Sequence, residues 1–184
     1  MLTILLLLVP LTPAFGQSTS LALSSGTTGL NGTVSLNLSL TSPATNIPSG
    51  IQWTLSYTAG DVASVSIAAG PALTAANKTL NCNTIKGSST CLAVGLNANP
   101  IHTGVVAVVT VTLPSATSSA SVPLSIKNPV GVLADGTSTT VSGTGSVITV
   151  QGWQPTGPSL SFLQWLVLGG GVLLFTALAL RQRR

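Results

Sequence analysis

The feature that most constrains this chain is a long hydrophobic segment near its C-terminus. Residues 160–180 contain no charged side chain and are followed at once by Arg181-Gln182-Arg183-Arg184. As a helix this segment would be roughly 31 Å long at about 1.5 Å per residue, which matches the hydrocarbon thickness of a bilayer. The sequence therefore predicts one C-terminal transmembrane helix over residues 160–180.

The residues at the two ends of the predicted span indicate its orientation. Phe162 and Trp165 lie near the start, where aromatic rings favour the membrane interface. Arg181, Arg183 and Arg184 belong to a basic tail, residues 181–184, which the positive-inside rule places in the cytoplasm. These five side chains are the predicted membrane anchor, with the preceding domain outside the cytoplasm, in the periplasm or at the cell surface. The layout also resembles the C-terminal sorting tags of exported bacterial proteins, so a retained anchor and a cleaved tag both stay open.

The N-terminus has the pattern of a secretory signal peptide. A short apolar run, residues 4–9, is broken by Pro10 and Pro13. Ala14-Phe15-Gly16 then places small residues at positions −3 and −1 of a cleavage site. The run is too short to span a bilayer. The sequence predicts a signal peptide at residues 1–16 and export of the chain from Gln17 onward.

Charge excludes several classes of function for the segment between the two ends. Its basic residues are Lys78, Lys86 and Lys127 and its acidic residues are Asp61 and Asp135, so the formal net charge is 3 − 2 = +1. It has no basic patch for nucleic acid and no acidic cluster for calcium. The sequence therefore predicts neither a nucleic-acid partner nor a metal site or cofactor.

The two cysteines form a candidate structural disulfide. Cys82 and Cys91 would both face an oxidising compartment after export, and an even cysteine count favours pairing. His102 is the only histidine, so the cysteines lack further ligands for a zinc site. A disulfide between Cys82 and Cys91 is the predicted outcome.

Alternating apolar and polar residues predict β-strands along the chain. The runs at 33–40 and 51–57 alternate throughout, with Trp53 and Tyr57 in the apolar phase of the second run. Residues 105–113 begin apolar in both phases, which predicts a central strand covered on both sides. Further strands are indicated by Ala63, Val65 and Ile67; Leu92, Val94 and Leu96; Val122, Leu124 and Ile126; Val141; and residues 146–150.

Turn residues separate these runs, and no helical periodicity of useful length appears. The turns are indicated by residues 29–32, Pro48-Ser49-Gly50, Gly70-Pro71, Asn99-Pro100, Asn128-Pro129 and Asp135-Gly136. Eight or nine short strands at this spacing predict an all-β fold, an antiparallel β-sandwich of jelly-roll type, over residues 17–150. Residues 151–159, rich in proline and glycine, are the predicted stalk between sandwich and membrane.

Several short motifs occur in an order that resembles a bacterial cohesin domain over about residues 21–150. They are Gly29-Leu30-Asn31-Gly32-Thr33-Val34, residues 50–57 (GIQWTLSY), residues 65–71 (VSIAAGP), residues 104–111 (GVVAVVTV) and residues 145–150 (GSVITV). The resemblance implies a jelly-roll sandwich, related in fold to some carbohydrate-binding modules, that grips dockerin modules of polysaccharide-degrading enzymes. Two features depart from the family: Ser56-Tyr57-Thr58-Ala59 replaces its Ser-Tyr-Asp-Pro turn, and the recognition strand offers Gly50 and Gln52 in place of acidic groups.

Catalysis is not expected, because the chain has few groups able to act as acid, base or nucleophile. Asp61 and Asp135 are the only carboxylates, and both fall in predicted turns. His102 is interpreted as a loop residue after Asn99-Pro100, without a nucleophile-elbow motif to complement it. The chain is therefore predicted to be non-enzymatic.

The remaining functions are kinds of binding. The first is a membrane-anchored cohesin-type module that binds a protein partner, of dockerin type, linked to polysaccharide degradation. The second is a carbohydrate-binding or adhesive protein, which needs exposed planar aromatics among Trp53, Tyr57 and Trp153. The third is a structural envelope protein that associates through strand edges. Exposed aromatics on a flat face favour the second, and a polar face with a few central apolar residues favours the first.

Overall fold

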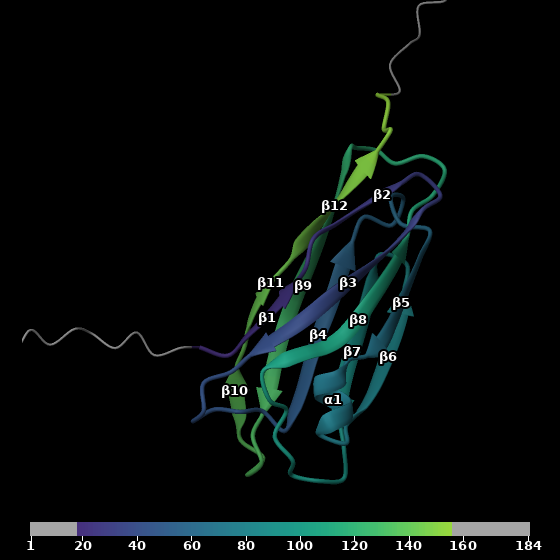
Figure 1. The fold of residues 1–184 in the computed structure, drawn as a ribbon. Helices are drawn as coiled ribbons and strands as arrows, with labels where there is room; N and C mark the ends of the chain where they lie inside the picture. Colours follow the sequence, from purple (N-terminus) through teal and green to yellow (C-terminus); the bar gives the residue numbers. More distant parts are fainter. Residues whose placement is uncertain (1–17, 156–184) are drawn as a thin grey trace, which may run out of the picture. The chain divides into compact units, whose positions relative to one another are not determined.

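The computed structural model describes residues 18–155, which form a sandwich of two β-sheets with one short helix (Figure 1). The strands are β1 Ser20–Leu23, β2 Gly26–Gly29, β3 Thr33–Thr41, β4 Gly50–Tyr57, β5 Ser64–Ala69, β6 Thr79–Ile85, β7 Ser88–Val94, β8 Gly104–Thr112, β9 Ser121–Val132, β10 Ser138–Thr140, β11 Ser142–Thr144 and β12 Ser146–Gln151. The all-β sandwich predicted from the sequence is confirmed. The described part has twelve strands instead of eight or nine, because β1, β2 and β6 were not predicted and two short strands, β10 and β11, flank Val141 where one was expected.

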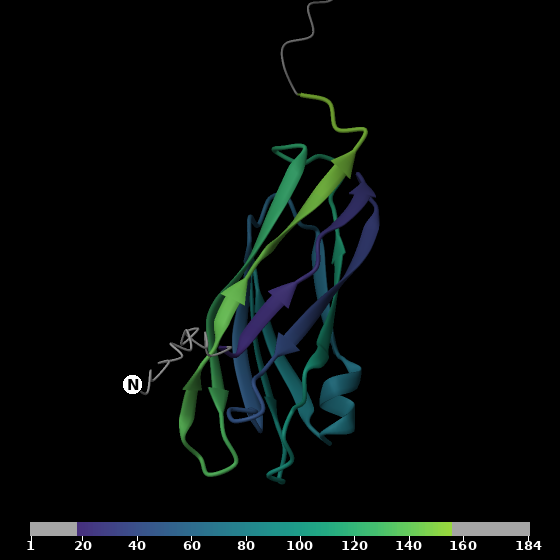
Figure 2. The same cartoon turned by 60° about the vertical axis from the view of Figure 1, so that its left-hand side comes forward.

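The two sheets share one side of the sandwich and are separate on the other. One sheet has the order β11-β1-β3-β8-β5, and the other β2-β12-β9-β4-β7-β6 with β10 added to β9. The chain passes from the first sheet to the second between β1 and β2 and again between β11 and β12, as the adjacent purple and light-green strands of Figure 2 show. The pairs β1–β11 and β2–β12 are parallel, and all the others are antiparallel.

The core lies between the sheets and is built from the alternating apolar phases. Leu36, Leu38 and Leu40 of β3 are buried, as predicted, and β4 contributes Trp53 with no exposed surface. From β9, the core receives Val122, Leu124 and Ile126. Each such side chain stabilises the fold by about 1.5–3 kcal/mol when it leaves water. The sandwich therefore rests on an aliphatic core around one tryptophan.

Strand β8 lies inside its sheet, between β3 and β5, as expected for a central strand. A β-bulge opposite Leu38 and Ser39 inserts Val106, so that Val106 and Ala107 are both fully buried although they are consecutive. Val108, on the outer face, keeps part of its surface exposed. The prediction that both faces are covered is therefore wrong, because the doubly apolar pattern arises in part from the bulge.

Two of the predicted turns have a different structure. Gly70-Pro71 begins helix α1, Pro71–Ala75, in which proline occupies the first turn and Leu73 is fully buried. No helix was predicted here, because five residues are too few to show a helical period. Asn128-Pro129 forms a bulge inside β9, with Asn128 at φ 47°, where proline's missing N–H is tolerated.

The predictions for the two ends of the chain concern residues outside the described range. These are the signal peptide at 1–16, the span at 160–180 with Phe162 and Trp165, and the basic tail with Arg181, Arg183 and Arg184. Among residues 18–155, no helix is long and apolar enough to cross a membrane. Within the segment 151–159, Gln151 completes β12 and the indole N–H of Trp153 donates to the Thr117 carbonyl at 3.2 Å.

Candidate functional site

The outward side chains of β9, β4 and β7 form a continuous surface that we call the β4 face. Strand β4 lies between β9 and β7, and directly paired residues of antiparallel strands project to the same side. The face consists of Gly50, Gln52, Thr54 and Ser56 from β4; Ser88, Thr90, Leu92 and Val94 from β7; and Ser125, Lys127, Val130 and Val132 from β9. Its inward-facing partners include Trp53 and Cys91, which are fully buried. The core thus holds the face in place from behind.

One end of the β4 face is apolar. Leu92, Gln52 and Val130 form one row across the three strands. Val94 and Val132 form the next row, on either side of Gly50. The four aliphatic side chains are between 40% and 42% exposed, which leaves a cluster of apolar surface around a glutamine.

Gly50 allows the two valines to approach the middle strand. A Cβ atom at Gly50 would lie 3.5 Å from Cγ1 of Val94 and 3.9 Å from Cβ of Val132. Gly50 is itself buried, with Val94 and Val132 on either side of it. The two valines therefore form one apolar surface across β4.

The other end of the β4 face is polar and nearly uncharged. Thr90, Thr54 and Lys127 form a row, and the hydroxyls of Thr54 and Thr90 share a hydrogen bond of 3.0 Å. The serines at 88, 56 and 125 make the next row. Lys127 is the only charged side chain on this surface. The face therefore combines an apolar end with an end made of hydroxyl groups and one lysine.

Strand β7 directs Leu92 and Val94 outward, the residues that, with Leu96, indicated a strand in the sequence. Cys91 and Ala93 are fully buried, whereas Leu92 and Val94 point outward and Leu96 lies fully exposed in the loop that comes next. Cys-Leu-Ala-Val is apolar in both phases, so the local pattern has no preference. Pairing with β4 decides which residues of β7 face the core, because Cys91 lies opposite the buried Trp53.

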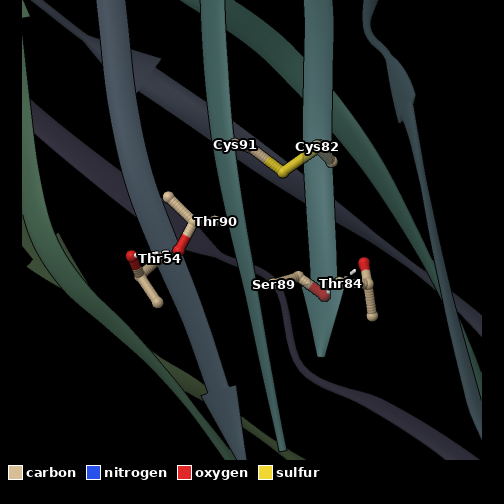
Figure 3. Close-up of a disulfide and its surroundings, with 6 residues drawn as sticks. All are labelled: Thr54, Cys82, Thr84, Ser89, Thr90 and Cys91. Carbon is tan, nitrogen blue, oxygen red and sulfur yellow. Dashed lines mark hydrogen bonds between the residues drawn. A yellow bond between two sulfur atoms is a disulfide. The ribbon is translucent and has the colours of Figure 1, made fainter. Parts of the chain in front are cut away.

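The predicted disulfide between Cys82 and Cys91 is present and joins β6 to β7 behind the β4 face. The two cysteines are direct partners in the β6–β7 ladder, with Cα atoms 4.1 Å apart (Figure 3). Next to them, the hydroxyls of Thr84 and Ser89 share a hydrogen bond of 2.9 Å. The disulfide holds the outermost strand of this sheet on its neighbour.

The two carboxylates and the histidine of the described part lie in three separate loops. Asp61 is buried and accepts hydrogen bonds from the backbone N–H and the hydroxyl of Ser118. Asp135 is in the predicted turn before Gly136, where the side-chain and backbone hydrogen bonds of Thr137 lower the pKa of its carboxyl group. His102 is exposed in a loop, as predicted.

The described residues contain no cluster suited to a metal ion. Within residues 18–155, no three or more histidine, cysteine or acidic side chains come together. Lys78 is a buried residue, and desolvation lowers the pKa of its ammonium group. Lys78 Nζ donates to the carbonyl oxygen and to Oδ1 of Asn97, both at 2.8 Å, which ties the start of β6 to the loop after β7.

The three aromatic side chains of the described part are not arranged as a sugar platform. Trp53 is fully buried, as predicted, and its indole N–H has no hydrogen-bond partner. Tyr57 and Trp153 are half-buried against the core. Stacking on sugar rings needs an exposed aromatic face. None of these three residues offers one on the β4 face.

Neither a family model nor a curated protein matches the sequence of this chain. Similar solved structures are cohesins. The sixth cohesin of scaffoldin B from Acetivibrio cellulolyticus, in complex with a Cel5 dockerin, is 17% identical, with a TM-score of 0.62 over 73% of this chain and 100% of that one. The non-cellulosomal cohesin from the archaeon Archaeoglobus fulgidus is 14% identical, with a TM-score of 0.61 over 73% of this chain and 91% of that one.

A third similar structure is the cohesin CaCohA2 from Clostridium acetobutylicum. In its complex with CaDoc0917 it is 16% identical to this chain, with a TM-score of 0.64, and covers 73% of this chain and 100% of the cohesin. At these identities the likeness concerns the fold. It confirms that residues 18–155 form a cohesin-like β-sandwich.

Proposed function

We propose that this protein is a non-enzymatic binding module and that the β4 face holds a protein partner. The observation that carries the proposal is the aliphatic cluster of Leu92, Val94, Val130 and Val132, which projects from β7 and β9 on either side of β4 and is followed along the strands by hydroxyl groups. Apolar surface bordered by polar groups is common in protein interfaces. A partner that covers the cluster removes its apolar surface from water.

The partner that we propose is a dockerin-like module of a polysaccharide-degrading system. Similar cohesin structures include complexes with dockerins, among them that of the Acetivibrio cellulolyticus cohesin. The strand that corresponds to the family's recognition strand carries Gly50 and Gln52, which supply no charge. Recognition here would depend on shape and apolar contact, with Lys127 as the one ionic contact.

A carbohydrate ligand is the second candidate, and the described surface supports it less well. Trp53 lies in the core, and Tyr57 and Trp153 pack against it. A polysaccharide would have to be held by hydroxyl and amide groups alone. We therefore rank it below a protein partner.

A binding assay with matched variants tests the β4 face. Residues 18–153 lie within one compact unit that contains every strand, so this segment is suitable for immobilisation in its oxidised form. Dockerin modules encoded in the same genome are then titrated with and without calcium. Leu92→Asp should weaken binding at least tenfold, because it places a charge in the apolar cluster. Ser66→Asp adds the same charge to the outer face of the other sheet and should leave binding unchanged.

Two results would contradict the proposal. The first is an equal affinity of the Leu92→Asp and Ser66→Asp variants, which would place the site elsewhere. The second is the retention of polysaccharide, with no dockerin bound by the unaltered protein. That result would favour carbohydrate binding as the function.

We extend the proposal to the location of the protein: the chain is exported and held at a membrane by residues 160–180. Its support is the charge-free segment followed by Arg181, Arg183 and Arg184, together with the cleavage pattern at residues 14–16. The mature protein should begin at Gln17 by mass spectrometry and sediment with membranes. A chain that ends at residue 159 should appear in the soluble fraction. Membrane retention of that shortened chain would contradict the anchor.

A further inference from the structure

Strand β6 leaves one side of the sandwich with an open edge. On the opposite side, the two sheets are linked by the passages from β1 to β2 and from β11 to β12. Here the sheets end at β5 and β6, which lie on the same side of the sandwich (Figure 1). Within residues 18–155, nothing pairs with the outer edge of β6. Its N–H and C=O groups are therefore open to another strand.

The edge of β6 lacks the usual protection against strand pairing. Protein edges are commonly protected by charged side chains, proline or a bulge. Residues 79–85 (TLNCNTI) contain no charge and no proline, pair with β7 in an unbroken register, and are exposed at six of seven positions. A regular edge of this length is suited to the addition of a further strand.

The geometry of the β6–β7 ladder shows which residues would accept that strand. Antiparallel partners alternate between wide, hydrogen-bonded pairs and narrow pairs whose backbone groups point away from each other. The Cα atoms of Cys82 and Cys91 are 4.1 Å apart, which identifies a narrow pair. Leu80, Cys82 and Thr84 therefore direct their N–H and C=O groups outward. The disulfide fixes this edge in place before any partner arrives.

A pocket lies beside the hairpin end of the same edge. It has a volume of about 440 Å³ and lies between the loop after β4, the start of β5 and the tip of the β6–β7 hairpin. Apolar lining comes from Tyr57, Val62, Val65 and Ile85, and Lys86 adds an ammonium group. A strand added to β6 would bring one of its side chains to this pocket.

The charge of Lys86 indicates the kind of partner that suits this edge. The two carboxylates within residues 18–155 have other partners: Asp61 accepts hydrogen bonds from Ser118, and Asp135 accepts them from Thr137. A second copy of this chain fits less well. Residues 78–86 contain two lysines and no carboxylate, so the β6 strand of another copy supplies no acidic group for Lys86.

We propose that the β6 edge and its pocket form a second binding site, which captures an extended segment of a partner protein by β-strand addition. That segment would carry an apolar side chain for the pocket and a carboxylate for Lys86. The site lies at the side of the sandwich and uses the backbone of β6, so it is separate from the β4 face.

The test is a selection of random twelve-residue peptides, displayed on phage, against the full chain. Selected peptides should alternate β-branched and polar residues, with an aspartate or glutamate, and should bind less tightly as salt rises. Thr84→Pro removes an outward N–H that β7 does not use, and should reduce peptide affinity at least tenfold. Thr84→Ala also lacks the hydroxyl but keeps the N–H, so it should bind the peptides clearly more tightly than Thr84→Pro does. Lys86→Gln should weaken binding several-fold.

Amide exchange provides a readout that does not depend on the proline variant. Bound peptide should slow exchange at Leu80, Cys82 and Thr84 and leave the amides of the β4 face unchanged. Selected peptides that bind the Thr84→Pro and Thr84→Ala chains equally would overturn the proposal, as would protection confined to the β4 face. Concentration-dependent dimers that Thr84→Pro abolishes would overturn it in favour of a second copy. Loss of dockerin binding alone would leave this site unaffected.

Discussion

Asp61 and Ser118 join two loops that are 57 residues apart in the sequence. Oδ1 of Asp61 accepts a hydrogen bond from the backbone N–H of Ser118 at 2.6 Å, and Oδ2 accepts one from its hydroxyl at 2.8 Å. Thr117, the preceding residue, accepts the indole N–H of Trp153. One buried carboxylate thus holds the loop after β4 to the loop before β9, next to the point where the chain leaves the last strand.

We expect Asp61→Ala to lower the free energy of unfolding by about 2–3 kcal/mol, because it removes two hydrogen bonds that a buried carboxylate accepts from Ser118. Urea unfolding of the oxidised protein measures the loss. Asp135→Ala removes the other carboxylate, which is exposed, and is the matched control. Equal losses for the two variants would show that the Asp61–Ser118 contact contributes little.

The disulfide should stabilise the fold moderately. Closing a loop of about ten residues reduces the entropy of the unfolded chain by an amount equivalent to about 2–3 kcal/mol. The double variant Cys82→Ala, Cys91→Ala should lose that much stability in denaturant unfolding and keep its sheet structure by circular dichroism. A change within error of zero would mean that β6 is held without the disulfide.

Trp53 should contribute through its volume and not through its indole N–H. The side chain is fully buried, and Nε1 has no hydrogen-bond partner. Trp53→Ala should cost about 3–5 kcal/mol because it opens a cavity in the core. Trp53→Phe removes only an unsatisfied donor and part of the ring, so it should cost about 1–2 kcal/mol. A loss for Trp53→Phe as large as that for Trp53→Ala would contradict this interpretation.

Asp135 should make the turn after β9 sensitive to acid. Hydrogen bonds from the hydroxyl and then the N–H of Thr137 lower the carboxyl pKa in the folded protein. The unfolded chain therefore binds this proton more tightly than the folded one, and the contribution to stability is present above the ordinary carboxyl pKa of about 3.9. It is lost as the pH falls through the lower, folded value.

Titration of the Asp135 carboxyl carbon by nuclear magnetic resonance measures this effect. Thr137→Val keeps the backbone donor and removes the hydroxyl, so the pKa of Asp135 should rise toward its ordinary value. Ser138→Ala, on the adjacent residue, should leave it unchanged. An unaltered pKa in Thr137→Val would show that the hydroxyl does not bind the carboxylate in solution.

The strands that could be predicted are those in which apolar residues occupy only one of the two alternating sets of positions. Leu36, Leu38 and Leu40 alternate with polar residues, so only one side of β3 can face the core. The same holds for Val122, Leu124 and Ile126 of β9. The disulfide was also predictable, because the chain has two cysteines and no competing metal ligands.

Tertiary structure decided the features that matter most for the candidate site. Leu92 and Val94 face solvent because Cys91 pairs with Trp53, and no local pattern in an apolar tetrapeptide encodes that pairing. Likewise, the partner of Asp61 is 57 residues away, so its sequence neighbours suggested only a turn. The sequence alone determined the alternation of the core strands, the cysteine pair and the expectation of export and anchoring. Long-range strand pairing decided that the β4 face and the β6 edge stay open. Strand order and register depend on contacts between residues that are distant in the sequence.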